Sequence, residues 1–328
     1  MKNFLLLIIL AIGLYACELN TLKTYKDGKI DKALRNKIDQ LDDIVIASVL
    51  TNNPKKIKSI MSDVLLEKSG EKIDQLIDEM GLYIKTDDYK VLNQFYVRNT
   101  TEGSGNAVKC VENTINDYLI NYKALNKEMF ISVLECEGGL SDFLVTCIYG
   151  KYPDGWKINI LQFGLYRINN QTAPELYMSA KKLYEKGCLV DAANYMILSS
   201  NVATPANKFW QYLNANDMKD FYDKVMSEAT AKYSFPIRLD DIETHPEIFN
   251  IAPLVLEEGY FPLIEYQTEI DLQDTVQTKL ENDKIHRQIA DILEGIEKEN
   301  TTIIYRAYNE KPDGSKQVPY YGFVRDVE

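Results

Sequence analysis

Residues 143–165 consist of two hydrophobic runs on either side of a turn signal. The runs are Phe143-Leu144-Val145-Thr146-Cys147-Ile148-Tyr149 and Trp156-Lys157-Ile158-Asn159-Ile160-Leu161-Gln162-Phe163-Gly164-Leu165, and the turn is Pro153-Asp154-Gly155. β-Branched and aromatic residues favour strands, and an Asp-Gly pair between two such runs is typical of a hairpin. The sequence therefore predicts a long antiparallel hairpin here.

Further strands precede this hairpin. Residues 91–97, 118–122 and 129–134 are rich in strand-forming residues, and residues 100–106 form a polar, glycine-containing loop. Upstream of them, apolar residues recur at helical spacing in three stretches, which are 30–49, 57–65 and 73–80. Helices followed by an antiparallel meander predict an α+β domain in which the N-terminal helices pack on one face of a curved sheet.

This order, together with Gly155-Trp156-Lys157-Ile158 in the last strand, resembles the nuclear-transport-factor-like cone fold. The resemblance spans roughly residues 30–170 and implies a pocket between the helices and the bent sheet. In the ketosteroid-isomerase branch of that fold, an Asp base works with a Tyr and a protonated acid. The predicted sheet contains tyrosines, but none matches that branch residue by residue, so no catalytic role is assigned: Tyr96, Tyr118, Tyr122 and Tyr149.

Residues 176–205 resemble a tetratricopeptide helical hairpin. The matching positions are Ala180, Leu183, Gly187, Ala192, Met196, Ser199 and Pro205. One copy cannot form a solenoid, so the sequence predicts a single packed pair of helices. Residues 209–232 have the spacing of a further helix. Strand signals at 261–266, 301–308 and 320–324, with a helix at 276–297, predict a small C-terminal α+β domain.

The first seventeen residues have the form of an export signal. Lys2 precedes an apolar run over residues 4–12, and the segment closes with Leu14-Tyr15-Ala16-Cys17. A cysteine directly after a small residue resembles a bacterial lipoprotein signal, which implies cleavage before Cys17 and lipid attachment to its thiol. An uncleaved membrane helix is the alternative, but the run is shorter than the ~20 residues that span a bilayer. By family resemblance, Glu18 favours the outer membrane, on a face that the sequence leaves open.

The predicted organisation has five parts. They are a signal peptide (1–16), a tether (17–29), the cone-like α+β domain (30–172), a helical segment with the hairpin (173–232) and the C-terminal α+β domain (233–328).

Composition limits the partners. The chain of 328 residues has a formal charge of −12 and no dense Lys/Arg cluster, which argues against nucleic acid as a ligand. The same charge argues against electrostatic adhesion to anionic lipid, so the N-terminal lipid is the predicted membrane contact. A protein, a glycan or a small molecule remains possible as a further ligand, and no cofactor is predicted.

Four cysteines follow Cys17: Cys110, Cys136, Cys147 and Cys188. An exported protein can form disulfides, and Cys136 and Cys147 lie on neighbouring predicted strands, so they are the favoured pair. The alternative is that all four are small buried hydrophobic residues. No C-x-x-C spacing occurs, so neither a zinc site nor a thioredoxin-like motif is indicated.

Residues that could carry chemistry are few. His245 lies among Asp240, Asp241, Glu243 and Glu247, which suggests a base or metal ligand, but a loop of solvated charges is the preferred interpretation. His286 is predicted to be a surface residue of a helix. Gly103-Ser104-Gly105 lacks the lysine and helix signal of a phosphate loop, and no nucleophile motif occurs.

Two functions are therefore weighed. The favoured hypothesis is an exported, membrane-anchored lipoprotein that acts as a non-catalytic binding or assembly module. The alternative is a hydrolase or isomerase of the cone domain with a carboxylate base, which requires a carboxylate and a Tyr or Asn to converge in an apolar cavity. A third possibility, a secreted glycoprotein, rests on the Asn-x-Thr triplets at Asn99, Asn170 and Asn300.

Overall fold

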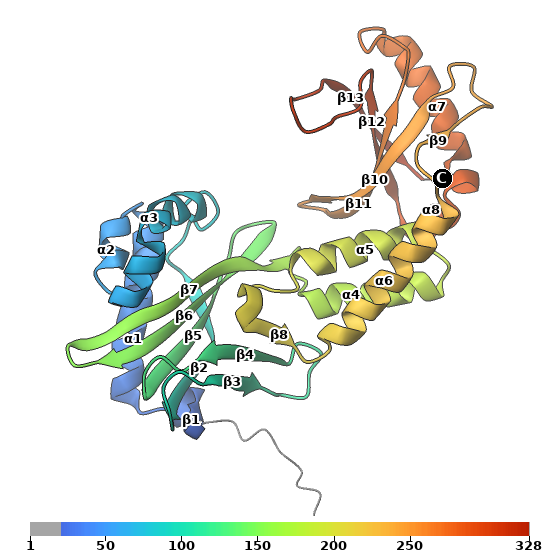
Figure 1. Cartoon of the computed structure of the whole chain (residues 1–328). Helices are drawn as coiled ribbons and strands as arrows, with labels where there is room; N and C mark the ends of the chain where they lie inside the picture. The colour runs from blue at the N-terminus through green and yellow to red at the C-terminus, as the bar shows by residue number, and fades with distance from the viewer. Residues whose placement is uncertain (1–20, 328) are drawn as a thin grey trace, which may run out of the picture.

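Figure 1 shows the computed structural model of the chain, in which residues 21–327 are described. The fold is α+β with mainly antiparallel sheets, so the predicted fold class is confirmed. The helices are α1 (Lys32–Leu50), α2 (Pro54–Lys58), α3 (Asp63–Met80), α4 (Ala173–Glu185), α5 (Leu189–Asn201), α6 (Ala215–Lys232), α7 (Thr275–Ile292) and α8 (Ile296–Glu299). No helix among residues 21–327 is both long enough and apolar enough to cross a membrane.

The first sheet has five antiparallel strands and contains the hairpin that the sequence predicts. In spatial order they are β1 (Thr21–Lys26), β2 (Tyr89–Asn99), β5 (Glu128–Cys136), β6 (Ser141–Tyr152) and β7 (Gly155–Ile168). The chain leaves this sheet after β2 to form a smaller one, which consists of β3 (Gly105–Cys110), β4 (Tyr118–Lys123) and β8 (Trp210–Tyr212).

Local signals set the helix boundaries in the N-terminal part. The Asp31 side chain caps α1 by accepting from the backbone N–H of Leu34, and Pro54 occupies the first turn of α2. Ser62 caps α3 in the same way through the N–H of Leu65, which splits the predicted 57–65 stretch between α2 and α3. The predicted helix over 73–80 is the second half of α3, which ends before Gly81.

The first sheet is covered on both faces, whereas the sequence analysis expected helices on one. On one face, α1 and α3 bury a core with Phe130, Leu134 and Tyr149. On the other face, the smaller sheet and α4 bury a second core, in which Tyr118 and Trp210 stack with ring centroids 3.8 Å apart. Strands β5 and β6 are consequently buried along nearly their whole length.

Helices α4 and α5 form the predicted antiparallel pair, with Gly187 in the turn between them. Gly187 has φ +79°, a conformation that glycine adopts without a Cβ penalty. Residues 210–212, which the sequence analysis placed in a helix, form β8 instead, and helix α6 begins at Ala215. Figure 1 shows α4, α5 and α6 between the first sheet and the C-terminal sheet.

The C-terminal sheet has five strands. Their spatial order is β13 (Tyr320–Asp326), β12 (Thr302–Tyr308), β11 (Gly259–Gln267), β10 (Glu247–Leu256) and β9 (Ile237–Arg238). Strands β11 and β12 are parallel, because α7 carries the chain between them. The three predicted strands of this part are present. The predicted helix over 276–297 is divided, because α7 ends at Ile292 and α8 begins at Ile296 after Gly295, which has φ +91°. Strands β9 and β10 are additional to the prediction.

Candidate groove between α3 and β7

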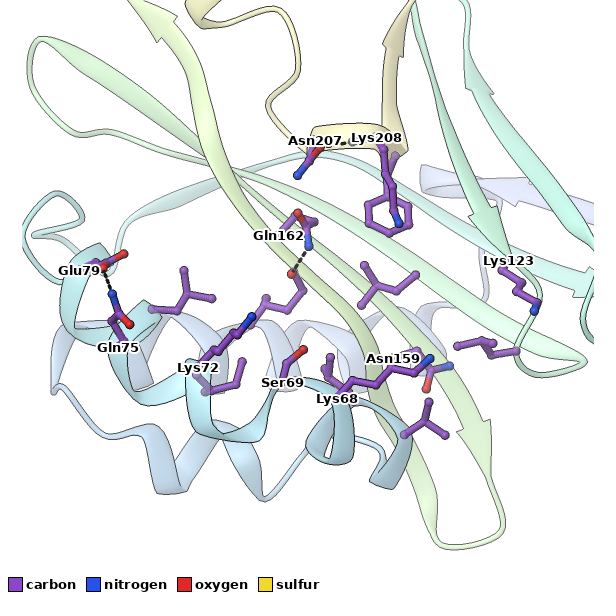
Figure 2. Close-up of a pocket in the computed structure, with 18 residues that line it drawn as sticks. Lys68, Ser69, Lys72, Gln75, Glu79, Lys123, Asn159, Gln162, Asn207 and Lys208 are labelled. Carbon is purple, nitrogen blue, oxygen red and sulfur yellow. Dashed lines mark hydrogen bonds between the residues drawn. The ribbon is translucent and has the colours of Figure 1, made fainter.

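A groove of about 990 Å³ runs between helix α3 and the outer strand β7. Figure 2 shows α3 along one side and the 207–209 turn and the end of β4 on the other. Its lining is contributed by segments far apart in the sequence: Val64, Leu65, Lys68, Ser69, Lys72, Ile73, Gln75, Leu76, Glu79, Lys123, Leu125, Asn159, Ile160, Leu161, Gln162, Asn207, Lys208 and Phe209. We call this cavity the α3–β7 groove.

Four lysines surround the groove, although the chain as a whole is acidic. Lys68 and Lys72 lie one helical turn apart on α3, and Lys123 and Lys208 lie on the opposite side. All four side chains are exposed. None of the four takes part in an ion pair within residues 21–327. Glu79 is the one carboxylate among the described lining residues, and it accepts a hydrogen bond from Gln75 at 2.6 Å. The groove therefore favours a negatively charged ligand.

The floor of the groove is apolar and follows the edge of β7. Ile160 packs against the core on one face of the sheet and Leu161 belongs to the core on the other, so a cavity that both residues line opens on the strand edge. Gln162 donates from Nε2 to the Leu161 carbonyl oxygen at 2.7 Å, as Figure 2 shows. An ammonium rim over an apolar floor suits a ligand with both acidic and apolar groups.

A carboxylate and a tyrosine also converge, but inside the core between α1 and the sheet. Asp42 accepts hydrogen bonds from Ser132 Oγ at 2.5 Å and from Tyr149 OH at 2.6 Å. Burial raises the pKa of Asp42 to about 7, because the loss of hydration outweighs the two hydrogen bonds that favour the charged form. We call these three residues the Asp42 network.

The Asp42 network meets only half of the condition for a catalytic site. All three of its side chains are fully buried, and none of them lines the α3–β7 groove. Phe130 and Ile46 belong to the same core as Tyr149. Asp42 is 0 % exposed, so the geometry does not favour a carboxylate base here.

The histidines are not brought together. His245 is exposed on a loop, and its Nδ1 lies 3.8 Å from an Asp240 carboxylate oxygen. His286, expected at the surface, is partly buried: its Nδ1 lies 2.8 Å from Tyr305 OH and its Nε2 lies 3.1 Å from the Asp326 carbonyl oxygen. Within residues 21–327, no group of three His, Cys, Asp or Glu side chains is arranged to hold a metal.

The favoured disulfide does not form. Cys136 and Cys147 lie on the paired strands β5 and β6 as expected, but Cys136 faces Phe143 and Cys147 faces Ser132. This register separates them by four residues, or roughly 13 Å along the strand, which exceeds the reach of a disulfide. Both are free thiols, as are Cys110 and Cys188, and all four are buried, in agreement with the alternative interpretation.

The remaining site residue, Cys17, lies outside the described residues, and its lipidation stays a prediction. Comparison of the chain with protein-family models, with curated proteins and with solved structures finds no match.

Sequence reasoning missed both the groove and the Asp42 network. The groove joins residues from four distant segments, and none of them carries a motif. Asp42 did leave a signal, because it lies on the apolar stripe of α1, four residues after Ile38 and four before Ile46. A carboxylate at such a position indicates a buried polar partner.

Proposed function

We propose that this chain is an exported, lipid-anchored binding protein of the bacterial cell envelope, and that its α3–β7 groove holds an anionic ligand. The anchor is Cys17, supported by the signal-like sequence before it. The observation that carries the binding role is the set of four lysines around an apolar floor in a chain of charge −12. The rival enzyme hypothesis is less well supported, because its carboxylate is sealed in the core.

The anchor is tested by expressing the full chain in a bacterial host with Cys17 intact or changed to serine. We expect the intact chain in the membrane fraction, with a diacylglyceryl mass on the peptide that begins at Cys17. The Cys17→Ser chain should lack this mass and leave the membrane fraction. An intact chain that keeps Met1, or carries a free thiol at Cys17, would overturn the proposed anchor.

The groove is tested with 8-anilinonaphthalene-1-sulfonate, a fluorescent probe that joins an anionic sulfonate to apolar rings. A Lys68→Glu/Lys72→Glu variant should bind it at least tenfold more weakly at low salt, because two nearby charges change sign. The matched control is Lys32→Glu/Lys37→Glu, which makes the same change at exposed positions of α1. Equal affinity of wild type and groove variant would refute an anion site in the groove.

A further inference from the structure

Strand β7 is the outer strand of its sheet, and its free edge forms the floor of the α3–β7 groove. The start of this edge is already paired. Ile158 donates to the Ile60 carbonyl at 2.8 Å and accepts from the Ser62 N–H at 2.9 Å, which forms a short parallel bridge just before α3. Further along, the next pairing on this edge within the described chain is the bridge between Ile168 and Gln171. The edge between Ile158 and Ile168 is therefore open.

The first part of this open edge, residues 159–162, lines the groove. In an antiparallel pair, alternate residues direct their N–H and C=O groups toward the neighbouring strand and away from it. Ile158 is directed outward, because its N–H and C=O bond to the segment before α3. The register shift between Ile158 and Ile160 moves the alternation by one residue, which makes Leu161 the next outward-directed residue. By alternation Phe163 belongs to the same set. These groups are what an added strand would hydrogen-bond.

From these observations we infer that the α3–β7 groove receives an extended, acidic segment of another protein as an additional strand on β7. The inference rests on the proposed function and specifies its ligand. Extended peptides bind by adding to free sheet edges, where backbone hydrogen bonds give affinity and alternate side chains give specificity. The chain itself already uses this edge in the same way at Ile158.

The lysines of the groove favour an acidic peptide as the added strand. Lys68 and Lys72 border one side of the added strand, and Lys123 and Lys208 border the other. Carboxylates on the peptide would reach these ammonium groups, while its apolar side chains would contact Leu65, Leu76 and Phe209. A basic or proline-rich peptide fits poorly, because it would repel the lysines or lack the N–H donors.

The test begins with a display library of random ten-residue peptides. The library is selected on the full chain and counter-selected on the Lys68→Glu/Lys72→Glu variant. We expect enriched sequences with Asp or Glu at alternate positions and no proline. Failure to enrich any peptide on the wild-type chain over the variant would overturn the inference.

The best enriched peptide is then N-methylated at one backbone position at a time. Strand addition predicts an alternating pattern, in which methylation of every second residue weakens binding at least tenfold and methylation of the others has little effect. Amide hydrogen exchange at Leu161 and Phe163 should slow when the peptide binds. Tolerance of N-methylation at every position, or unchanged exchange at both amides, would refute the added strand.

The controls separate the possible failures. If the fluorescent sulfonate depends on Lys68 and Lys72 but no peptide shows the alternating pattern, the anion site stands and the strand does not. If neither ligand depends on the lysines, both proposals fail. If the chain self-associates and the enriched peptide dissociates it, the occupant is a second copy of this chain and a foreign partner is refuted.

Discussion

Changing Asp42 to asparagine tests whether the buried Asp42 carboxyl group makes the stability of the chain depend on pH. A pKa raised from 3.8 to about 7 means that the folded state holds this proton more tightly than the unfolded state does. The contribution of this proton to the free energy of unfolding is greatest below pH 4, and it is lost as the pH rises toward 7. At 1.36 kcal/mol per tenfold change in acidity, the full loss is roughly 4 kcal/mol.

Asparagine removes this pH dependence, because its amide does not ionise. Its oxygen can still accept from Tyr149, but its NH₂ would face Ser132 Oγ, which now donates to Asp42. We expect this mismatch to cost about 1 kcal/mol at pH 4. Above pH 7 the variant should be the more stable protein, by up to about 3 kcal/mol, since the wild type must then bury a charge or take up a proton when it folds.

The assay is urea denaturation of both proteins between pH 4 and pH 8.5, followed by tryptophan fluorescence. Trp156 reports on the core that contains Asp42, and Trp210 reports on the core across the sheet. The difference between the two proteins isolates Asp42, because the other titrating groups cancel. The control is Asp87→Asn at an exposed position before β2. Curves that stay parallel from pH 4 to pH 8.5 would refute the reasoning.

Three further changes have defined outcomes. Gly164→Ala places a Cβ 2.3 Å from the Pro205 carbonyl oxygen, so we expect a loss of about 2 kcal/mol in urea denaturation and faster hydrogen exchange at 204–209. Arg167→Ala leaves the buried Glu135 carboxylate without its cation and should cost about 3 kcal/mol at pH 7. Asp191→Asn should stabilise the chain above pH 6, where denaturation would show a gain of up to about 3 kcal/mol, because burial raises the pKa of Asp191 to about 6.

Each of these changes has a companion measurement. Gly105→Ala is the control for the first, because a Cβ there meets no atom within 4 Å. Glu135→Gln should offset part of the cost of Arg167→Ala, and strictly additive losses would contradict the buried ion pair. For Asp191, a gain at pH 5 equal to that at pH 8 would contradict the assigned titration.

The elements with strong periodicity could be predicted from the sequence, and the weakly patterned ones could not. Helix α1 and the β6–β7 hairpin have long apolar patterns with clear end signals. The sequence predicts a tether over residues 17–29, where the structure has strand β1, because Thr21–Lys26 is a short polar segment that becomes a strand by pairing with β2. The sequence predicts helix where strand β8 lies, because Trp210 and Leu213 are three residues apart, which is also a helical spacing.

Tertiary geometry accounts for the rest. The register of β5 on β6 decides which residues face Cys136 and Cys147, and the sequence shows only that the strands are neighbours. The α3–β7 groove depends on how the 207–209 turn returns to β7. Gly164 allows that return by leaving room for Pro205, but a glycine in a strand does not tell which segment approaches it.

Strand β1 limits how far a lipid-tethered body could move from its bilayer. Thr21, where the chain joins β2 opposite Asn99, is four residue steps after Cys17. At about 3.5 Å per residue, the segment from Cys17 to Thr21 can span at most ~14 Å. Figure 1 shows β1 and the C-terminal sheet at opposite ends of the molecule. The first sheet would then stay beside the lipid headgroups, while the C-terminal sheet could extend toward the aqueous space beyond them.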